Sequence, residues 1–468
     1  MRLLIGIILF HLSSSAQQIL VSPYIQPGNA STLDYEEKVV IWQTDNVAGQ
    51  FSVEYGKNPN QYISAEVQTT HLHLGGRHLI LYRSVLPKLE FDQSYYYRVT
   101  LMTKPIMEAK FETRSRKPSS RFVIFGDCGV GSPAEAEIAY QAYLKKPEFI
   151  LITGDNVYSR GQVSEYLQNY FPYYNREDAG PDKGAPLMRS IPFYLSIGNH
   201  DVGAADLGRF PDGLAYYYYF DLPLNGPVFK NTVVATGRAD RVDTFRQVIG
   251  SRFPGMANFS FDHGNVHITC LDSNPHINVN DPELISWIEN DMKNSKATWK
   301  IVAFHHPGFN SSNAHYEGQW MRALAPVFER SGVDLVLNGH VHNYQRSYPL
   351  HFEPKKDSTG KPLIGANGRG RVDGVFKIDK KFDGSKKNEP DGIIYIVTGA
   401  GGARLYDTAL SEKPERWVHT PAENWMPFTV KLISRTHSFS MIETKNDRLI
   451  LRQFDTKGNE LDKIELEK

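Results

Sequence analysis

Short apolar or alternating segments, separated by Gly, Asn and Pro, characterise the first part of the chain. They include residues 38–44 (KVVIWQT), 50–56 (QFSVEYG) and 77–86 (RHLILYRSVL), and another begins near Tyr95. Alternation with a period of two is typical of strands that are buried on one face, and short strands with turn residues between them are typical of all-β domains. We therefore predict a β-sandwich over residues 17–115.

After a polar, Pro-containing linker at residues 113–120, short apolar runs alternate with stretches of helical spacing. Residues 132–144 and 281–294 are predicted helices, and the second opens with Asp281 as a cap and Pro282 in the first turn. This alternation indicates an α/β domain, in which the carboxyl ends of the strands carry the chemistry. The predicted strands are 121–125, 149–153, 193–197, 266–271, 300–304, 334–338 and 393–398.

The last part of the chain contains an irregular stretch followed by further strands. Residues 351–392 are rich in Lys and Gly with little periodicity, so we predict a long surface insertion there. Strand patterns return between about residues 425 and 468, in PFTVKLI, SFSMIET and RLILRQFD. The predicted α/β domain therefore extends over residues 121–468.

The N-terminus has the pattern of a secretory signal. Met1 and Arg2 precede an apolar run up to Phe10, and a small polar stretch ends at Ala16. The run is too short to span a bilayer, and a buried first strand is the alternative. We predict a signal peptide over residues 1–16, so that the protein is exported, secreted or periplasmic, and begins near Gln17.

Composition narrows the classes of partner and the redox chemistry. Lys and Arg together number 52, as do Asp and Glu, so the formal net charge is zero. The composition therefore does not indicate binding to nucleic acid, and no run of like charges indicates binding to a membrane surface. Cys128 and Cys270 both follow apolar runs, which favours buried free thiols over a single disulfide. Asn29, Asn258 and Asn310 begin N-x-Ser sequons, which matter only if the host glycosylates.

A polar cluster follows directly after each of five predicted strands. Alone, each cluster is as compatible with a turn, a helix cap or a polar strand face as with a ligand site. Their joint occurrence at strand ends indicates a single site. The clusters are Gly126-Asp127-Cys128-Gly129, Gly154-Asp155-Asn156-Val157-Tyr158, Gly198-Asn199-His200-Asp201, Val302-Ala303-Phe304-His305-His306 and Gly339-His340-Val341-His342.

The residue types in these clusters point to metal ions. Carboxylate, amide, phenol and imidazole without thiolate exclude a zinc finger and suit hard or borderline metals. The ligands are too many for one open site, whereas two metals ~3.5–4 Å apart that share a carboxylate would use them all. His340 and His342 lie on the same face of an extended segment, so one can serve each metal. Tyr158 is three residues after Asp155 and can approach the same ion.

These clusters resemble the metallophosphoesterase superfamily and, within it, the purple acid phosphatases, over about residues 121–410. Pro87 and Leu89 before the Tyr95 strand resemble the tyrosine corner of fibronectin type III sandwiches. The N-terminal sandwich is thereby similar to the domain that precedes catalysis in the plant-like, high-molecular-weight branch. The resemblance implies a four-layer αββα sandwich of two mixed sheets, preceded by a fibronectin-III-like domain.

The resemblance also implies a role for each site residue. A Fe(III) would be held on one side and a divalent Fe, Zn or Mn on the other, with one carboxylate bridging them. Two histidines would be catalytic and, with the amide ligand, would bind substrate; one of them would be the general acid. The Fe(III) ligands would be Asp127, Tyr158 and His342, the ligands of the divalent metal would be Asn199, His305 and His340, and Asp155 would bridge the two metals. The catalytic histidines would be His200 and His315. Ala314 stands where plant-like members often carry another His.

The function implied is that of a secreted acid phosphatase acting on small phosphorylated substrates. A metal-bound hydroxide at a binuclear Fe(III)–M(II) centre would attack the monoester, and trivalent iron would give an acid pH optimum. A phosphodiesterase or nucleotide hydrolase on the same fold is the nearest alternative. A metal-binding or adhesion protein with a vestigial site is the alternative from another class.

Four further sequence features near these clusters have either a structural or a functional interpretation. His306 is either structural or a ligand, and Asp201 either orients His200 or caps a turn. Arg346 carries a charge that suits a phosphate. Residues 398–406 (TGAGGARLY) lack the Lys-Ser/Thr end of a P-loop, and the resemblance implies a tight backbone passage near the site.

Overall fold

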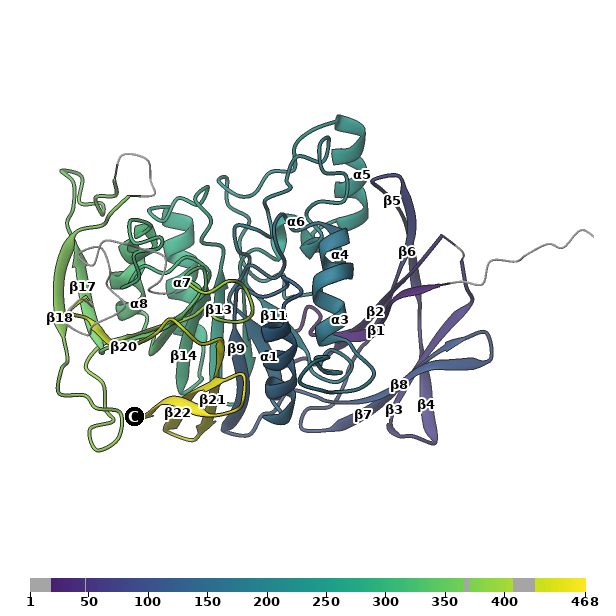
Figure 1. The fold of residues 1–468 in the computed structure, drawn as a ribbon, viewed down its shortest axis with the longest axis horizontal. Helices are drawn as coiled ribbons and strands as arrows, with labels where there is room; N and C mark the ends of the chain where they lie inside the picture. The colour runs from purple at the N-terminus through teal and green to yellow at the C-terminus, as the bar shows by residue number, and fades with distance from the viewer. Residues whose placement is uncertain (1–17, 47, 366–369, 407–425) are drawn as a thin grey trace, which may run out of the picture.

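The N-terminal part of the chain forms two antiparallel sheets. A computed structural model describes residues 18–46, 48–365, 370–406 and 426–468, so the predicted signal peptide lies outside the described residues. Each of the two sheets has four strands (Figure 1). In sheet order they are β1 (Ile19–Gln26), β2 (Lys38–Thr44), β6 (Arg77–Leu86) and β5 (Gln68–Leu74), and β4 (Gln61–Ala65), β3 (Phe51–Asn58), β7 (Ser94–Leu101) and β8 (Lys104–Glu112).

Apolar side chains from both sheets share one core, as expected for a β-sandwich. Trp42 of β2 stacks on Tyr82 of β6 with ring centres 5.2 Å apart, and Tyr97 of β7 is fully buried. Before β7, the Tyr95 hydroxyl accepts a hydrogen bond from the Glu90 N–H at 3.2 Å. That bond places a tyrosine at a corner of the sandwich, while the resemblance to fibronectin type III stays a prediction.

Two larger mixed sheets form the rest of the molecule, which confirms the predicted fold class. One has six strands and the other seven. The six-stranded sheet runs β11 (Phe193–Leu195), β10 (Phe149–Ile152), β9 (Ser119–Phe125), β21 (Ser438–Lys445), β22 (Arg448–Asp455) and β23 (Glu460–Glu467). The seven-stranded sheet runs β12 (Phe259–His263), β13 (Val266–Leu271), β14 (Trp299–Phe304), β15 (Leu335–Asn338), β19 (Ile394–Thr398), β16 (Tyr344–Ser347) and β20 (Thr429–Ile433).

Helices cover the outer faces of the two sheets. The helix α1 (Pro133–Leu144) packs on β21 and starts at Ser132, whose side chain accepts the Glu135 N–H. On the other side, α7 (Pro282–Asn294) packs on β13 and begins after Asp281, the predicted cap. The remaining helices are α2 (Val163–Glu165), η1 (Tyr166–Tyr170), α3 (Phe171–Tyr174), α4 (Tyr216–Tyr219), α5 (Ala239–Ile249), α6 (Arg252–Gly255), η2 (Trp320–Leu324) and α8 (Ala325–Arg330).

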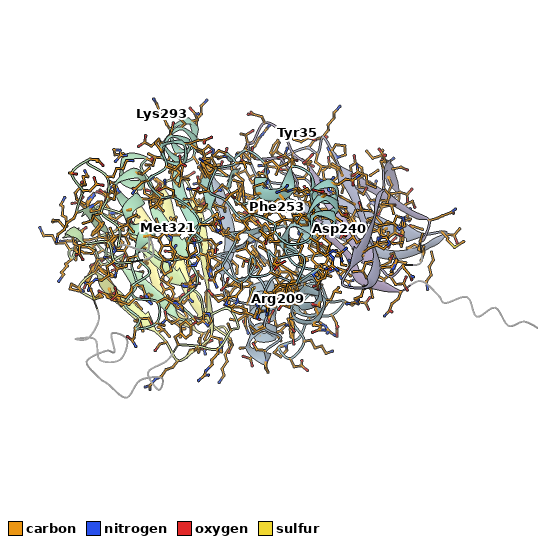
Figure 2. The ribbon with its side chains drawn as sticks, turned by 90° about the horizontal axis from the view of Figure 1, so that it is seen from above. Tyr35, Arg209, Asp240, Phe253, Lys293 and Met321 are labelled. Carbon is orange, nitrogen blue, oxygen red and sulfur yellow. The ribbon has the colours of Figure 1, made fainter. Side chains whose placement is uncertain are left out.

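Side chains fill the space between the layers (Figure 2). Met321 of η2 is buried at 2% exposure, whereas Lys293 near the end of α7 is exposed.

Cys128 and Cys270 are buried and free, as predicted. Of the sequon residues, Asn29 is exposed but Asn258 and Asn310 are buried, so glycosylation at those two positions would require the fold to open.

Two sequence interpretations need correction. The stretch 351–392 is not a plain surface insertion, because β17 (Leu350–Pro354) pairs with β18 (Gly374–Ile378) and buries Phe352. The segment 113–120 is more than a polar linker, since Arg114 is 2% exposed. Its guanidinium donates to Glu36 at 2.7 Å and to the Asp262 carbonyl at 3.2 Å, which ties the sandwich to the seven-stranded sheet.

None of the described helices has both the length and the apolar character needed to cross a membrane.

The strands that carry the predicted clusters are parallel within each sheet. The strands β9, β10 and β11 are parallel neighbours in one sheet, and β13, β14, β15 and β19 are parallel neighbours in the other. Parallel strands end at the same edge of a sheet, so three polar clusters lie together at the edge of the six-stranded sheet and two at the edge of the seven-stranded sheet.

Candidate metal centre

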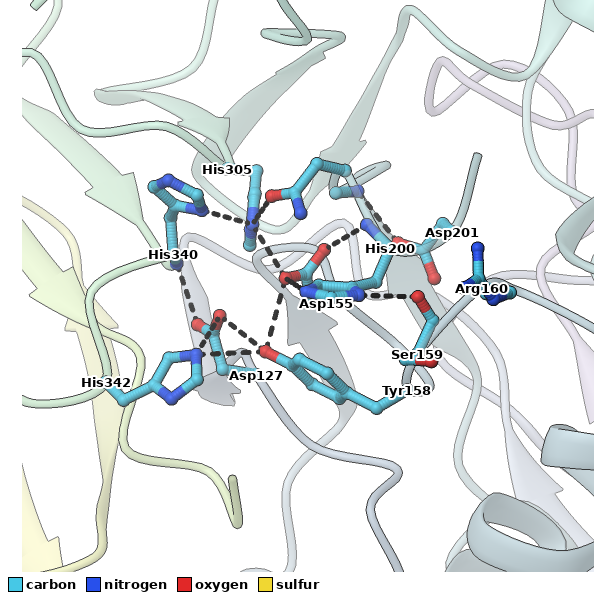
Figure 3. Close-up of polar contacts among 12 residues, drawn as sticks. Asp127, Asp155, Tyr158, Ser159, Arg160, His200, Asp201, His305, His340 and His342 are labelled. Carbon is cyan, nitrogen blue, oxygen red and sulfur yellow. Dashed lines mark hydrogen bonds and ion pairs between the residues drawn. The ribbon is translucent and has the colours of Figure 1, made fainter. Parts of the chain in front are cut away.

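The seven predicted metal ligands lie within one cluster, between the carboxyl ends of strands from the two sheets (Figure 3). Strands β9, β10 and β11 precede the ligands contributed by the six-stranded sheet, and β14 and β15 precede those contributed by the seven-stranded sheet. The residues are Asp127, Asp155, Tyr158, Asn199, His305, His340 and His342.

One group of ligand atoms surrounds the Tyr158 hydroxyl. The oxygen lies 3.1 Å from Asp127 Oδ1, 3.2 Å from Asp155 Oδ2 and 3.0 Å from His342 Nε2. Atoms that bind one ion at ~2.0–2.2 Å lie ~3 Å from one another. These four atoms therefore have the spacing of a set of ligands to a single cation.

A second group surrounds His305 Nε2. This nitrogen lies 3.1 Å from Asp155 Oδ2, 3.2 Å from Asn199 Oδ1 and 3.2 Å from His340 Nδ1. Asp155 Oδ2 thus belongs to both groups, which is where a carboxylate shared between two metals would have to lie. The donor set fits two adjacent ions of hard or borderline character.

Hydrogen bonds on the far side of two imidazoles turn the correct nitrogen toward the centre. His305 Nδ1 lies 2.9 Å from the Thr153 carbonyl oxygen, and His342 Nδ1 lies 2.7 Å from that of Arg404. A carbonyl oxygen can only accept, so each Nδ1 carries a proton, and Nε2 is the nitrogen that faces the centre. Both rings are therefore set as metal ligands before any metal binds.

Backbone N–H groups hold the two carboxylates in a similar way. The His340 N–H donates to Asp127 Oδ2 at 2.8 Å, and the His200 N–H donates to Asp155 Oδ1 at 2.8 Å. Each carboxylate thereby keeps its other oxygen directed at the centre. Asp127, Asp155 and His340 also have positive φ angles of 58°, 51° and 66°, a conformation that is uncommon for non-glycine residues.

Burial and neighbouring charges set the protonation of the central groups. Burial raises the pKa of Asp155, but the charge and hydrogen bond of His305 lower it by more. The net pKa is below its ordinary value, so the carboxylate is ionised. For Tyr158, burial and then the charges of Asp127 and Asp155 raise the pKa well above its ordinary value. A phenolate at this position therefore needs a strongly charged cation beside it.

The two predicted catalytic histidines lie at the rim of the cluster. His200 Nδ1 is 2.6 Å from the Ser159 carbonyl oxygen, and its Nε2 is 3.9 Å from Asp155 Oδ2. The His315 ring lies 4.1 Å from that of His340. Both side chains are thus close enough to contact a group bound at the centre.

The sequence analysis did not single out Tyr406, which also lies at the site. Its ring stacks on His342 at 4.2 Å and 7°, and its hydroxyl is 3.2 Å from His315 Nε2. Tyr406 ends the Gly-rich stretch 398–406, and its N–H donates to the His342 carbonyl at 3.1 Å. The only signal in the sequence was that this stretch ends a strand and passes near the site.

Three residues with open interpretations have structural partners. His306 Nδ1 lies 2.9 Å from Ser273 Oγ, although His306 can also approach His305 and His340. Asp201 accepts the Gly198 N–H at 2.7 Å, so it caps the turn that presents Asn199 and His200. Arg346 is paired with Asp462 at 2.6 Å.

Fold and candidate site are similar to those of metallophosphoesterases. Residues 120–344 match the model of the Calcineurin-like phosphoesterase family. This match supports hydrolase activity of the phosphoesterase class, as predicted.

Its relatives include purple acid phosphatases, which confirms the predicted resemblance. Phosphoenolpyruvate phosphatase of Allium cepa is 28% identical over 432 residues, covering 88% of this chain and 77% of that protein. Purple acid phosphatase 18 of Arabidopsis thaliana is 25% identical over 345 residues, covering 72% and 69%. The structure of purple acid phosphatase PPD1 from yellow lupin shares the fold with a TM-score of 0.63 at 16% identity, over 95% of this chain and 74% of that one.

Proposed function

We propose that this protein is an acid phosphatase that hydrolyses phosphate monoesters to an alcohol and inorganic phosphate. The observation that carries the proposal is the Tyr158 hydroxyl, 3.1 Å from Asp127 and 3.2 Å from Asp155. A phenol in the ligand set favours a trivalent ion on that side. The names of the relatives, phosphoenolpyruvate phosphatase and purple acid phosphatase, agree with this activity.

The two groups of ligand atoms suggest which residues would hold each metal. The group around Tyr158, with Asp127 and His342, would hold Fe(III), and the group around His305, with Asn199 and His340, would hold a divalent Fe, Zn or Mn. Asp155 would be shared. When bound, such a pair neutralises phosphate charge and activates water for in-line attack.

The protein's own residues would bind and orient the substrate. Asn199 and His200 adjoin the space beside Asp155, and the bond from His200 Nδ1 to the Ser159 carbonyl holds the ring with Nε2 toward that space. His315 would protonate the leaving oxygen from the opposite rim, with its ring held against His340 and Tyr406. The small phosphorylated substrate would thus lie between His200 and His315.

Metal analysis combined with a visible absorption spectrum and p-nitrophenyl phosphate hydrolysis tests the proposal. We expect iron, a tyrosinate absorption band and an acid pH optimum. Asp155→Asn should remove most of the activity and lower the bound metal, whereas Asp240→Asn, at an exposed carboxylate paired with Arg238, should change neither. An optimum above about pH 8 with Mn and no iron would overturn the proposal, which rests on the acidity that trivalent iron confers on bound water.

Two neighbouring hypotheses have direct measurements. Faster hydrolysis of bis(p-nitrophenyl) phosphate than of the monoester would favour a phosphodiesterase. We also propose export by the signal peptide at residues 1–16, which N-terminal sequencing of the mature protein would test.

A further inference from the structure

Beside the candidate centre, two arginines from different loops lie over one aromatic ring. The guanidinium carbon of Arg160 is 4.9 Å from the centre of the Phe210 ring, and that of Arg209 is 5.1 Å from it. Both arginines are exposed. Within the described ranges of the chain, no carboxylate forms an ion pair with either guanidinium. Two positive charges are therefore held close together without an anionic partner.

The first loop, which follows Tyr158, is rigidly built. The Glu165 carboxylate accepts the N–H groups of Ser159 at 2.6 Å, Arg160 at 3.1 Å and Gln162 at 2.9 Å. The Gln162 side chain in turn donates to Asp212 at 2.7 Å, which joins this loop to the segment that carries Phe210. The backbone below Arg160 is thus fixed relative to the aromatic ring.

The second loop is held by its own network. The Arg241 guanidinium donates to the carbonyls of Leu207 at 3.1 Å and Gly208 at 3.0 Å. The Phe210 N–H donates to the Asp206 carbonyl at 2.8 Å, and the Arg209 N–H donates to Asp206 Oδ1 at 3.2 Å. Arg209 and Phe210 therefore project from a turn whose polar groups are already satisfied.

The first loop connects this arrangement to the space proposed for the phosphate. Ser159, which directly precedes Arg160, accepts the bond from His200 Nδ1 at 2.6 Å. Figure 3 shows Arg160 beside Ser159, on the side of His200 that faces away from His340 and His342. A substrate that contacts His200 with its phosphate can extend toward the two arginines.

We propose that Arg160 and Arg209 form a second anion subsite, which recognises phosphate monoesters that carry another anionic group on the leaving-group side. This substrate class rests on the proposed function and deepens it. Guanidinium groups stay charged at all relevant pH values, and their planar array of donors matches carboxylate and phosphate oxygens. Contact with the Phe210 ring limits the rotamers of both side chains, so less entropy is lost when they bind an anion.

Binding of phosphonates to the metal-loaded full chain tests the subsite. The ligands are 4-phosphonobutyrate and butylphosphonate, which share a phosphonate and a four-carbon chain and differ by a terminal carboxylate. Calorimetry should give a Kd for 4-phosphonobutyrate about 10-fold lower, because only its carboxylate accepts hydrogen bonds from the guanidinium groups and exposure to water weakens these bonds. A third ligand, 1,4-butanediphosphonate, shows whether phosphate or carboxylate is preferred.

The variant Arg160→Ala/Arg209→Ala should reduce the ratio of the two Kd values to about 1, while the Kd for butylphosphonate stays within about 2-fold. The matched control is Arg238→Ala, which removes an exposed arginine already paired with Asp240 at 2.8 Å. It should keep the preference of the wild type. If the double variant does not fold, each single variant should lose part of the ratio.

A wild type without preference, or a double variant that keeps it, would overturn the subsite. Phosphonates are not hydrolysed, so this result does not depend on turnover. Absence of p-nitrophenyl phosphate hydrolysis would instead refute the proposed function. The two failures are therefore distinguishable.

Discussion

Replacing Tyr406 by phenylalanine should slow catalysis through His315. The hydroxyl lies 3.2 Å from His315 Nε2, whereas the ring stacks on His342 at 4.2 Å, so Tyr406→Phe removes the hydrogen bond and keeps the stack. A typical intramolecular hydrogen bond contributes ~0.5–1.5 kcal/mol. Loss of that contribution in the transition state lowers kcat/KM for p-nitrophenyl phosphate about 2- to 10-fold.

A double-mutant cycle shows whether the two residues act together. Kinetics of Tyr406→Phe, His315→Ala and the combined variant should give a coupling energy of about 1 kcal/mol, as expected for residues in direct contact. Tyr316→Phe is the control, because the Tyr316 hydroxyl contacts the Met426 sulfur at 3.4 Å instead of a site histidine. Strict additivity, or unchanged kinetics in Tyr406→Phe, would refute the positioning role of Tyr406.

Three further predictions concern other parts of the molecule. Tyr158→Phe should abolish the visible absorption band but leave the far-UV circular dichroism spectrum unchanged. Arg114→Met should lower the urea-derived unfolding free energy by ~3–5 kcal/mol because buried groups such as Glu36 lose their partner, whereas Arg98→Met, at a half-exposed pair, should change it far less. Burial lowers the pKa of His267, but two flanking carboxylates raise it from 6.5 to about 9, so protonated His267 stabilises the folded state. This contribution to the unfolding free energy is full below pH 6.5 and is lost as the pH rises through about 9. His267→Gln should remove that part of the pH dependence of unfolding; an identical profile would contradict the assignment.

The strands and the ligand clusters could be predicted because their signals are local. Residues 38–44 and 77–86 are the strands β2 and β6 as the sequence pattern predicts, since short apolar runs between turn residues are typical of buried strands. Three clusters follow β9, β10 and β11 and two follow β14 and β15, so each group could be placed together because parallel strands of one sheet end at one edge. That argument needs no knowledge of loop conformation.

Residues whose role depends on contacts far along the chain could not be predicted. Tyr406 reaches His315 only because the passage 398–406 runs along the segment that carries His342. Arg114 lies in a polar stretch, and only the packing of the sandwich against β12 buries it. The strand β23 is likewise defined by its pairing with β22 rather than by strong periodicity.

The strained turns of the site depend on one another, which gives the glycines in the motifs a structural reason. Asp127 and His340 both have left-handed backbone, which costs a non-glycine residue ~1–3 kcal/mol, yet the His340 N–H can donate to Asp127 Oδ2 at 2.8 Å only in this geometry. Each carboxylate oxygen also lies where a neighbouring side chain would begin. A Cβ on Gly339 would be 2.7 Å from Asp127 Oδ2, and one on Gly198 would be 2.1 Å from Asp155 Oδ1. Glycine at these two positions is therefore required by the approach of a carboxylate from another motif, so the motifs of Asn199 and His340 report the packing of a second motif as well as their own chemistry.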